Sequence, residues 1–275
     1  MPRAPAAKLT KPAAPKRVRQ QPVSNTVLVD GKPRYHEAAP EGIDVEQFRQ
    51  VVISRRSVRK FTAKAIPKAV LDDCLDMAML APCSSGLQPW EFYVVKSADK
   101  KAKLVKACMS QLAAKTASEL IVCVARTDRV NEFSRKMLRD WPMPDVPPLV
   151  KRYYQLIPTL YTPGPLNSLA LAKKAAFTLG GFVAPVPRGP HTREEVKLWA
   201  AKSTALACEN LVLALRAHGF DSCMMEGFDE VRVKKLLGLG SAAFPVMVVG
   251  AGERAEDGVF WPQVRFERAL FVHEV

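Results

Sequence analysis

Apolar residues recur along the chain in two patterns, one typical of helices and one typical of strands. Spacing of three and four residues, together with capping and proline signals, predicts helices over residues 45–53, 67–81, 99–118, 202–218 and 230–237. Short runs of apolar and β-forming residues predict strands over 91–95, 120–125, 245–250 and 269–274. This order of elements predicts an α+β fold.

Two of the segments have unusual compositions. The helix predicted over 202–218 is apolar on nearly every side, so we expect it to be buried in a core or an interface. Residues 137–192 hold ten of the 22 prolines. We therefore expect mixed short helices and loops there, a variable insert for which a role as a lid over a pocket is open.

The positive charge is distributed unevenly. The chain of 275 residues has 41 Lys and Arg against 27 Asp and Glu, a net charge of +14. Residues 1–29 contain six basic and no acidic residues, with five prolines, so we expect a disordered tail ahead of one domain over 30–275. A tail that binds nucleic acid or a membrane surface is an alternative, but no RRM, zinc-finger or KH motif accompanies it.

The sequence also limits the location and the metal chemistry of the protein. It has neither a secretory pattern at its start nor an apolar run of about 20 residues, so we expect a cytoplasmic protein without a nucleic-acid or membrane partner. Cys74, Cys108, Cys123 and Cys208 lie in apolar patterns and should be core residues. The four histidines are scattered, so we expect no metal site, and no local motif supports a Cys–His nucleophile pair.

Four segments carry groups that suit a ligand. Arg55, Arg56, Ser57 and Arg59 combine guanidinium forks with a hydroxyl, which favours an oxyanion such as phosphate, although a solvated basic turn has the same pattern. The other three are the small polar loop 81–90, the segment 219–229 ahead of a predicted helix, and Arg265. Each could also be a plain connection or a surface residue. The G-x-G at 250–252 has no helical pattern after it, which argues against a dinucleotide-binding fold.

Together these segments resemble the FMN-dependent nitroreductase family. The residues that carry the resemblance are Arg-Arg-Ser-Val-Arg-Lys-Phe at 55–61, Ala-Pro-Cys-Ser-Ser-Gly-Leu-Gln-Pro-Trp-Glu-Phe at 81–92, and Gly-Phe-Asp-Ser with Met-Glu-Gly-Phe at 219–228. They stand in the family's order and spacing, across about 45–126 and 200–270. The resemblance implies a three-layer α+β sandwich around a mostly antiparallel sheet. It also implies a homodimer with FMN at its interface and an exchanged C-terminal segment.

The resemblance assigns roles to particular residues. Arg55 and Arg265 would hold the FMN phosphate, Arg56 and Ser57 would contact the phosphate and ribityl chain, and Arg59 would lie near the N1/O2 edge of the ring. A cation there favours negative charge on the reduced ring. The remaining contacts would come from Cys83, Ser84, Ser85 and Gly86 of the other subunit, from Met224 and Met225 beside the ring, and from Glu226 and Gly227 through their backbone.

Two departures from the family pattern bear on the function. Gly86 stands where many relatives have Asn, and Ser110-Gln111-Leu112-Ala113 stands where relatives often place Asn and Lys.

The main hypothesis is an enzyme that uses NAD(P)H to reduce nitroaromatic or quinone acceptors in a ping-pong cycle. No side chain need act as acid or base, although Glu226 could give support. The alternative is an FMN-binding or regulatory protein with little turnover. Tyr153, Tyr154, Tyr161 or Phe177 would stack on an aromatic acceptor or pack within the insert.

Overall fold

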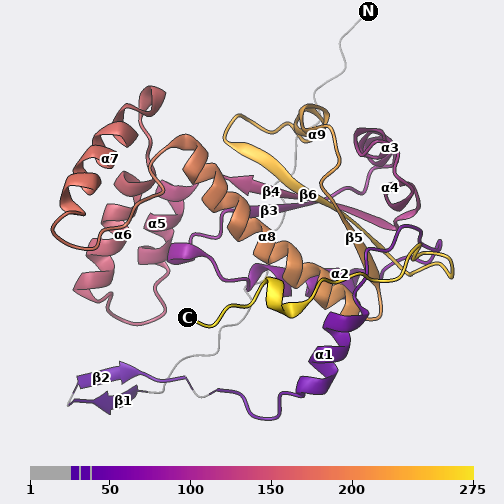
Figure 1. The fold of residues 1–275 in the computed structure, drawn as a ribbon, viewed down its shortest axis with the longest axis horizontal. Coiled ribbons are helices and arrows are strands. Elements are labelled where there is room, and N and C mark those ends of the chain that lie inside the picture. Colours follow the sequence, from indigo (N-terminus) through magenta and orange to yellow (C-terminus); the bar gives the residue numbers. More distant parts are fainter. Residues whose placement is uncertain (1–25, 31, 38) are drawn as a thin grey trace, which may run out of the picture. The chain divides into compact units, whose positions relative to one another are not determined.

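The computed structural model describes residues 26–30, 32–37 and 39–275, and the chain divides into two units, 1–41 and 42–275 (Figure 1). Within the first unit, β1 (Thr26–Val29) pairs antiparallel with β2 (Lys32–Tyr35). Asp30, between them, has a positive φ of 51°, as hairpin turns require. A disordered tail was expected over 1–29. Residues 1–25 lie outside the described residues, whereas 26–29 form a strand, which corrects the expectation for these four residues. The Asp30-Gly31 dipeptide is a turn signal from which the hairpin could have been predicted.

The second unit is built on an antiparallel sheet of four strands in the order β3-β4-β6-β5. Their bounds are β3 (Trp90–Val94), β4 (Glu119–Arg126), β5 (Asp221–Met225) and β6 (Ala243–Gly252). β4 and β6 are central and most of their residues are buried, which is why they appear in the sequence as apolar runs. An antiparallel sheet with helices on its faces confirms the α+β class expected from the sequence.

Helices supply the layers on both sides of this sheet. In the described part of the second unit they are α1 (Val45–Ser54), α2 (Lys68–Met79), α3 (Ala98–Ala107), α4 (Leu112–Thr116), α5 (Val130–Arg139), α6 (Pro148–Tyr161), α7 (Ser168–Gly180), α8 (Arg193–Ala217) and α9 (Glu230–Leu237). Three short 3-10 turns, Ser84–Gly86, Pro165–Asn167 and Arg268–Leu270, complete the elements there. None of the described helices is long and apolar enough to cross a membrane.

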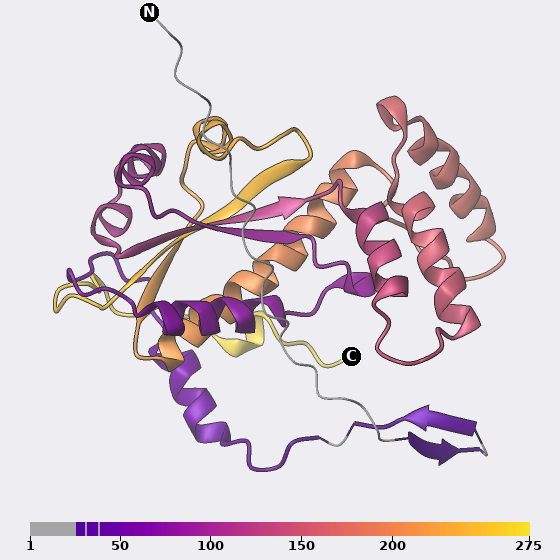
Figure 2. The ribbon, with the colours of Figure 1, turned by 180° about the vertical axis from the view of Figure 1, so that it is seen from behind.

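Strand β4 shows how the sheet separates two cores. Leu120, Val122 and Val124 face the cluster formed with α3, α4 and α9. Ile121 and Cys123, which alternate with them, face the cluster formed with α2 and α8. Figure 1 and Figure 2 show α8 running along the sheet with α2 beside it. The sheet is therefore the middle of three layers, and period-two alternation decides which side chain enters which core.

The insert predicted over 137–192 is more helical than its prolines suggest. It contains the end of α5 and all of α6 and α7, and these three helices gather at one end of α8 (Figures 1 and 2). Pro148 stands at the start of α6, where its missing N–H is harmless. Thr192 and Glu195 form a complete capping box at the start of α8, which ends the insert.

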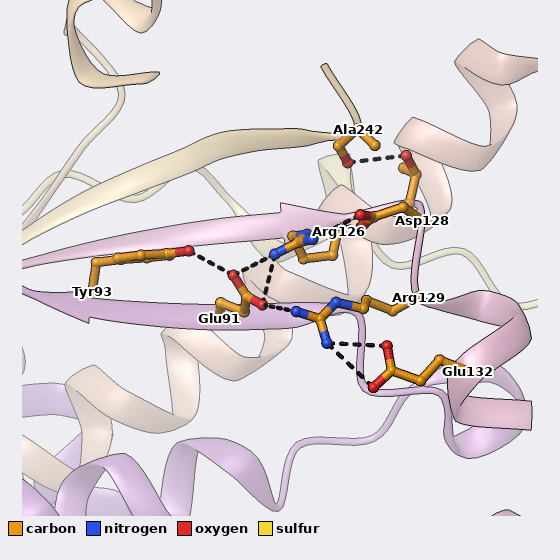
Figure 3. Close-up of polar contacts among 8 residues, drawn as sticks. Glu91, Tyr93, Arg126, Asp128, Arg129, Glu132 and Ala242 are labelled. Atoms are coloured by element: carbon orange, nitrogen blue, oxygen red, sulfur yellow. Dashed lines mark hydrogen bonds and ion pairs between the residues drawn. The ribbon is translucent and has the colours of Figure 1, made fainter. Parts of the chain in front are cut away.

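A charged network joins the start of α5 to the sheet (Figure 3). Arg126, at the end of β4 and 17% exposed, donates to both oxygens of Glu91 on β3 and to Asp128. Arg129, just before α5, reaches Glu91 at 3.3 Å and Glu132 at 3.1 Å. Tyr93 donates to Glu91 as well. Arg126, as a hydrogen-bond donor to Asp128, holds the pKa of this carboxyl below its usual range.

Three other expectations need correction. The helix predicted over 99–118 is broken into α3 and α4, because Met109 and Ser110 both have positive φ. The strand predicted over 269–274 is instead the 3-10 turn Arg268–Leu270 followed by exposed chain. The segment 219–229, predicted as a connection, contains β5. Cys74, Cys108, Cys123 and Cys208 are buried, as predicted, and Cys223 is buried with them.

Candidate functional site

The first predicted motif leads from α1 into an extended segment beside the sheet. Ser57 pairs with Ser222 of β5 as an isolated parallel bridge, and the Val58 N–H donates to the Ser222 carbonyl at 3.0 Å. The Arg59 N–H donates to the Gly258 carbonyl at 2.7 Å. Val58 is fully buried, whereas its neighbours Ser57 and Arg59 are exposed. The backbone of the motif is therefore fixed on both sides, by β5 and by Gly258.

These side chains line a cavity of about 510 Å³ together with the C-terminal segment. Its wall is formed by Arg55, Arg56, Ser57, Arg59 and residues 259–265. Arg56 donates from Nη2 to the Trp261 carbonyl at 2.6 Å, and Arg265 donates to the carbonyl of Val264. The fold thus brings Arg265 to the arginine motif across about two hundred residues of sequence. It unites two of the four segments that the sequence singled out.

The cavity suits an anionic ligand. Four arginines and one serine line a single space, and planar guanidinium forks bind phosphate oxygens in pairs. Arg55 also lies 3.8 Å from Glu209 of α8, an ion pair that orients it and offsets part of the positive charge. These hydrogen-bond donors have the charge and geometry to bind the phosphate end of FMN. Trp261 and Phe260 add apolar surface to the wall of the cavity.

A buried carboxylate is linked to the start of the arginine motif through Arg254. Asp221, only 4% exposed, accepts hydrogen bonds from Arg254 at 2.6 and 3.1 Å and from Arg216 at 2.9 Å. Arg254 also donates to the carbonyl of Ser54, at the end of α1 and next to Arg55. The ion cluster therefore links β5 to the point where the arginine segment begins. Sequence reasoning missed it, because the three residues lie on different elements.

Arg59 has a second contact behind the cavity. Its Nη1 lies 3.4 Å from the sulfur of Cys223, the residue that follows Ser222 on β5. Burial raises the pKa of the Cys223 thiol, while the positive charge of Arg59 acts in the opposite direction. The thiol is therefore neutral at physiological pH, and it orients Arg59 without neutralising it.

The loop of the second motif lies elsewhere. Cys83, Ser84, Ser85 and Gly86 are not part of the described wall of the cavity. Ser85 and Gly86 have positive φ of 63° and 60°, so the loop is tightly bent. Cys83 accepts a hydrogen bond from the Gln88 N–H at 3.1 Å, and burial raises the pKa of its thiol. The structure does not bring this loop to the cavity of the arginine motif.

The third motif is divided between core and surface. Met225 is 2% exposed and packs in the core near Gly250, so its side chain does not reach the surface, while Met224 is partly buried against the other core. Glu226 and Gly227 are exposed. The Gly227 carbonyl accepts a hydrogen bond from Gln111 Nε2 at 2.8 Å. Gln111 thus fixes this backbone.

The fold and the cavity define an α+β protein with an arginine-lined cavity. The model of the nitroreductase family matches residues 52–253. The chain belongs to the nitroreductase family.

Individual relatives agree with this assignment. An NADH dehydrogenase of Thermus thermophilus is 28% identical over 228 residues, which are 83% of this chain and 97% of the relative. A protein of Exiguobacterium sibiricum, crystallised in complex with FMN, has a TM-score of 0.61 at 23% identity and covers 83% of this chain and 97% of its own. An enone reductase of gut-bacterial fatty acid metabolism has a TM-score of 0.61 at 22% identity over 83% of this chain. These two structures show a shared fold.

Proposed function

We propose that the protein is an FMN-dependent oxidoreductase that takes electrons from NAD(P)H and reduces nitroaromatic or quinone acceptors in the cytoplasm. The cavity lined by four arginines, in a chain of the nitroreductase family, carries this proposal. The related NADH dehydrogenase supports a nicotinamide donor, and the related fold crystallised with FMN supports the flavin.

The chain's own residues bind and orient the cofactor. Arg55 and Arg265 hold the phosphate, while Arg56 and Ser57 hold the phosphate and ribityl chain. Arg56 is kept in place by the Trp261 carbonyl, and the backbone at 58–59 is fixed by β5 and Gly258. A site whose donors are already oriented loses little freedom when the ligand arrives, which strengthens binding.

The chemistry requires few side chains. When bound, FMN supplies the hydride acceptor and donor chemistry, two electrons at a time. Arg59 places a positive charge beside the ring and stabilises negative charge there. Gln111 holds the Gly227 carbonyl, so the peptide next to Glu226 keeps one orientation toward the ring. No side chain need transfer a proton in this scheme.

The site is completed by a second copy of the chain. No residue of α1 is buried, although the helix carries the large apolar side chains Phe48, Val52 and Ile53, all of which are exposed. Leu198 and Leu206 on α8 are exposed as well. Trp261, Phe266 and Phe271 of the C-terminal segment are exposed as well. Large apolar areas of this kind mark an interface, and a homodimer would cover them. It would also bring the loop 83–86 of one subunit to the cavity of the other.

Anaerobic reduction tests the proposed function. The purified protein, loaded with FMN, is mixed with NADH or NADPH and then with a nitroaromatic or a quinone. We expect the visible flavin absorption to be lost with a nicotinamide and to return with an acceptor. A protein that binds FMN but is reduced by neither nicotinamide would be a flavin-binding protein with little turnover, the alternative noted above.

Two arginine variants sharpen this test. Arg59→Ala should slow reduction by the nicotinamide, because the ring loses its neighbouring positive charge, and Arg59→Lys should restore part of the rate. Arg139→Ala removes an exposed arginine from α5 and serves as the matched control. Equal rates for Arg59→Ala and Arg139→Ala would contradict the role of Arg59. Light scattering on the same samples should give the mass of a dimer.

A further inference from the structure

The helical insert touches the loop of the second motif through two tyrosines of α6. The hydroxyl of Tyr153 shares a 2.6 Å hydrogen bond with Ser85 Oγ. The hydroxyl of Tyr154 donates to the Ser85 carbonyl at 3.1 Å. The two rings meet edge to face, with centroids 5.3 Å apart. Adjacent residues of one helix therefore hold the backbone and the side chain of the same serine.

The backbone of this loop needs such support. Ser85 has φ of 63°, a conformation that residues with a Cβ rarely adopt. Gly86 follows with φ of 60°, and a Cβ there would lie 3.3 Å from Met137 Cε and 3.8 Å from the Tyr154 hydroxyl. The insert thus occupies the space that a side chain at 86 would need. The glycine that departs from the family pattern fits the helices of this particular insert.

The two tyrosines differ in their surroundings. Tyr154 is 8% exposed and packs in the core with Leu87 and Ile157, so it anchors the insert. Tyr153 is 42% exposed, and Ser85, the hydrogen-bond partner of its hydroxyl, is partly buried. A hydroxyl pair allows either atom to donate. When Tyr153 donates to Ser85, the serine proton is free for a further acceptor, and linked hydrogen bonds of this kind strengthen one another.

We propose that Tyr153 is a positioning residue, which orients the Ser85 hydroxyl toward the bound flavin and so couples the insert to the cofactor. This inference rests on the proposed function, in which the loop 83–86 contacts FMN. It gives the insert a role beyond covering the site. A change in α6 would alter the affinity and the redox potential of the cofactor through a single hydrogen-bonded pair.

A double-mutant cycle tests the coupling. The variants are Tyr153→Phe, Ser85→Ala and the double substitution, and Tyr161→Phe is the control. Tyr161 lies on the same helix, where its ring packs edge-on to Trp199 at 4.8 Å. The measurements are the FMN dissociation constant of the apoprotein, the midpoint potential of the bound flavin, and the Tm. The last of these reports a purely structural effect.

We expect Tyr153→Phe to weaken FMN binding by about three- to tenfold, the loss of one neutral hydrogen bond, and to shift the potential. In the Ser85→Ala background it should have no further effect on either quantity. Its Tm should change no more than that of Tyr161→Phe. Equal effects of Tyr153→Phe with and without Ser85, or no effect at all, would overturn the inference while leaving the proposed function intact. A wild-type protein that takes up no FMN would overturn both.

Discussion

Asp221→Asn tests whether a buried residue that does not line the cavity nevertheless supports the arginines that do. The carboxylate is 4% exposed and accepts three hydrogen bonds from Arg216 and Arg254. Asn has nearly the same shape but no charge, and its amide group would face a guanidinium. Both arginines then lose their counter-charge, and Arg254 also loses the anchor that holds it against the Ser54 carbonyl.

The size of the effect follows from these contacts. Removing one partner of a buried ion pair costs about 3–5 kcal/mol, but the two arginines are 24% and 34% exposed and regain some hydration. We therefore expect a loss of about 2–4 kcal/mol in the free energy of unfolding. For a protein of this size each kcal/mol lowers Tm by roughly 2–4 °C. FMN affinity should fall as well, because the arginine segment begins next to Ser54.

The assay is urea and thermal unfolding of the apoprotein, followed by titration with FMN. Asp257→Asn is the matched control, since Asp257 is an exposed carboxylate paired with Lys60 in the same region. It should leave both the Tm and the FMN affinity unchanged. If Asp221→Asn matched this control in both measurements, the inference that the ion cluster supports the site would be refuted.

The remaining predictions concern the insert. His191 is buried and its ring stacks on Phe177. Burial is the main cause that lowers the pKa of His191. The positive charges of Lys173 and Lys174 lower it further, whereas the negative charge of Glu195 raises it. The unfolded chain therefore binds the proton first, and the free energy of unfolding should decrease as the pH falls below about 6.5. Urea unfolding of the wild type and of His191→Phe at pH 7.5 and 5.5 checks this. The free energy of unfolding should depend less on pH in His191→Phe, and an equal dependence in the two proteins would contradict the prediction. Glu91→Gln should weaken the network of Figure 3 and speed hydrogen exchange in α5, with Glu132→Gln as the milder control. Equal exchange in the two variants would argue against a central role for Glu91.

The central strands and α9 could be predicted from the sequence because burial and capping leave local signals. Residues 120–125 are apolar on both faces, and α9 begins after Asp229, whose side chain accepts from the Arg232 N–H, and ends at Gly238 in the left-handed region. β5 gave no such signal. It starts with Asp221 and Ser222, which are polar yet buried, and Asp221 is tolerated there because Arg216 of α8 and Arg254, beyond β6, neutralise it.

The candidate site was predicted in parts. The arginine motif and Arg265 could be identified from residue type and family resemblance, and the structure brings them to one cavity. The contacts of Arg56 with the Trp261 carbonyl and of Arg59 with Cys223 depend on tertiary approach and have no sequence pattern. The break in the helix predicted over 99–118 was missed for a related reason, since Met109 and Ser110 have positive φ without a glycine to signal it in the sequence.

The central claim is that the arginine-lined cavity recognises the phosphate of FMN. Titration of the apoprotein with FMN and with riboflavin, which lacks the phosphate, tests it directly. Charge-assisted hydrogen bonds are worth about 1.5–3 kcal/mol each, so losing two of them should weaken riboflavin binding by roughly a hundredfold or more. Equal affinity for the two flavins, or no binding of either, would contradict the claim.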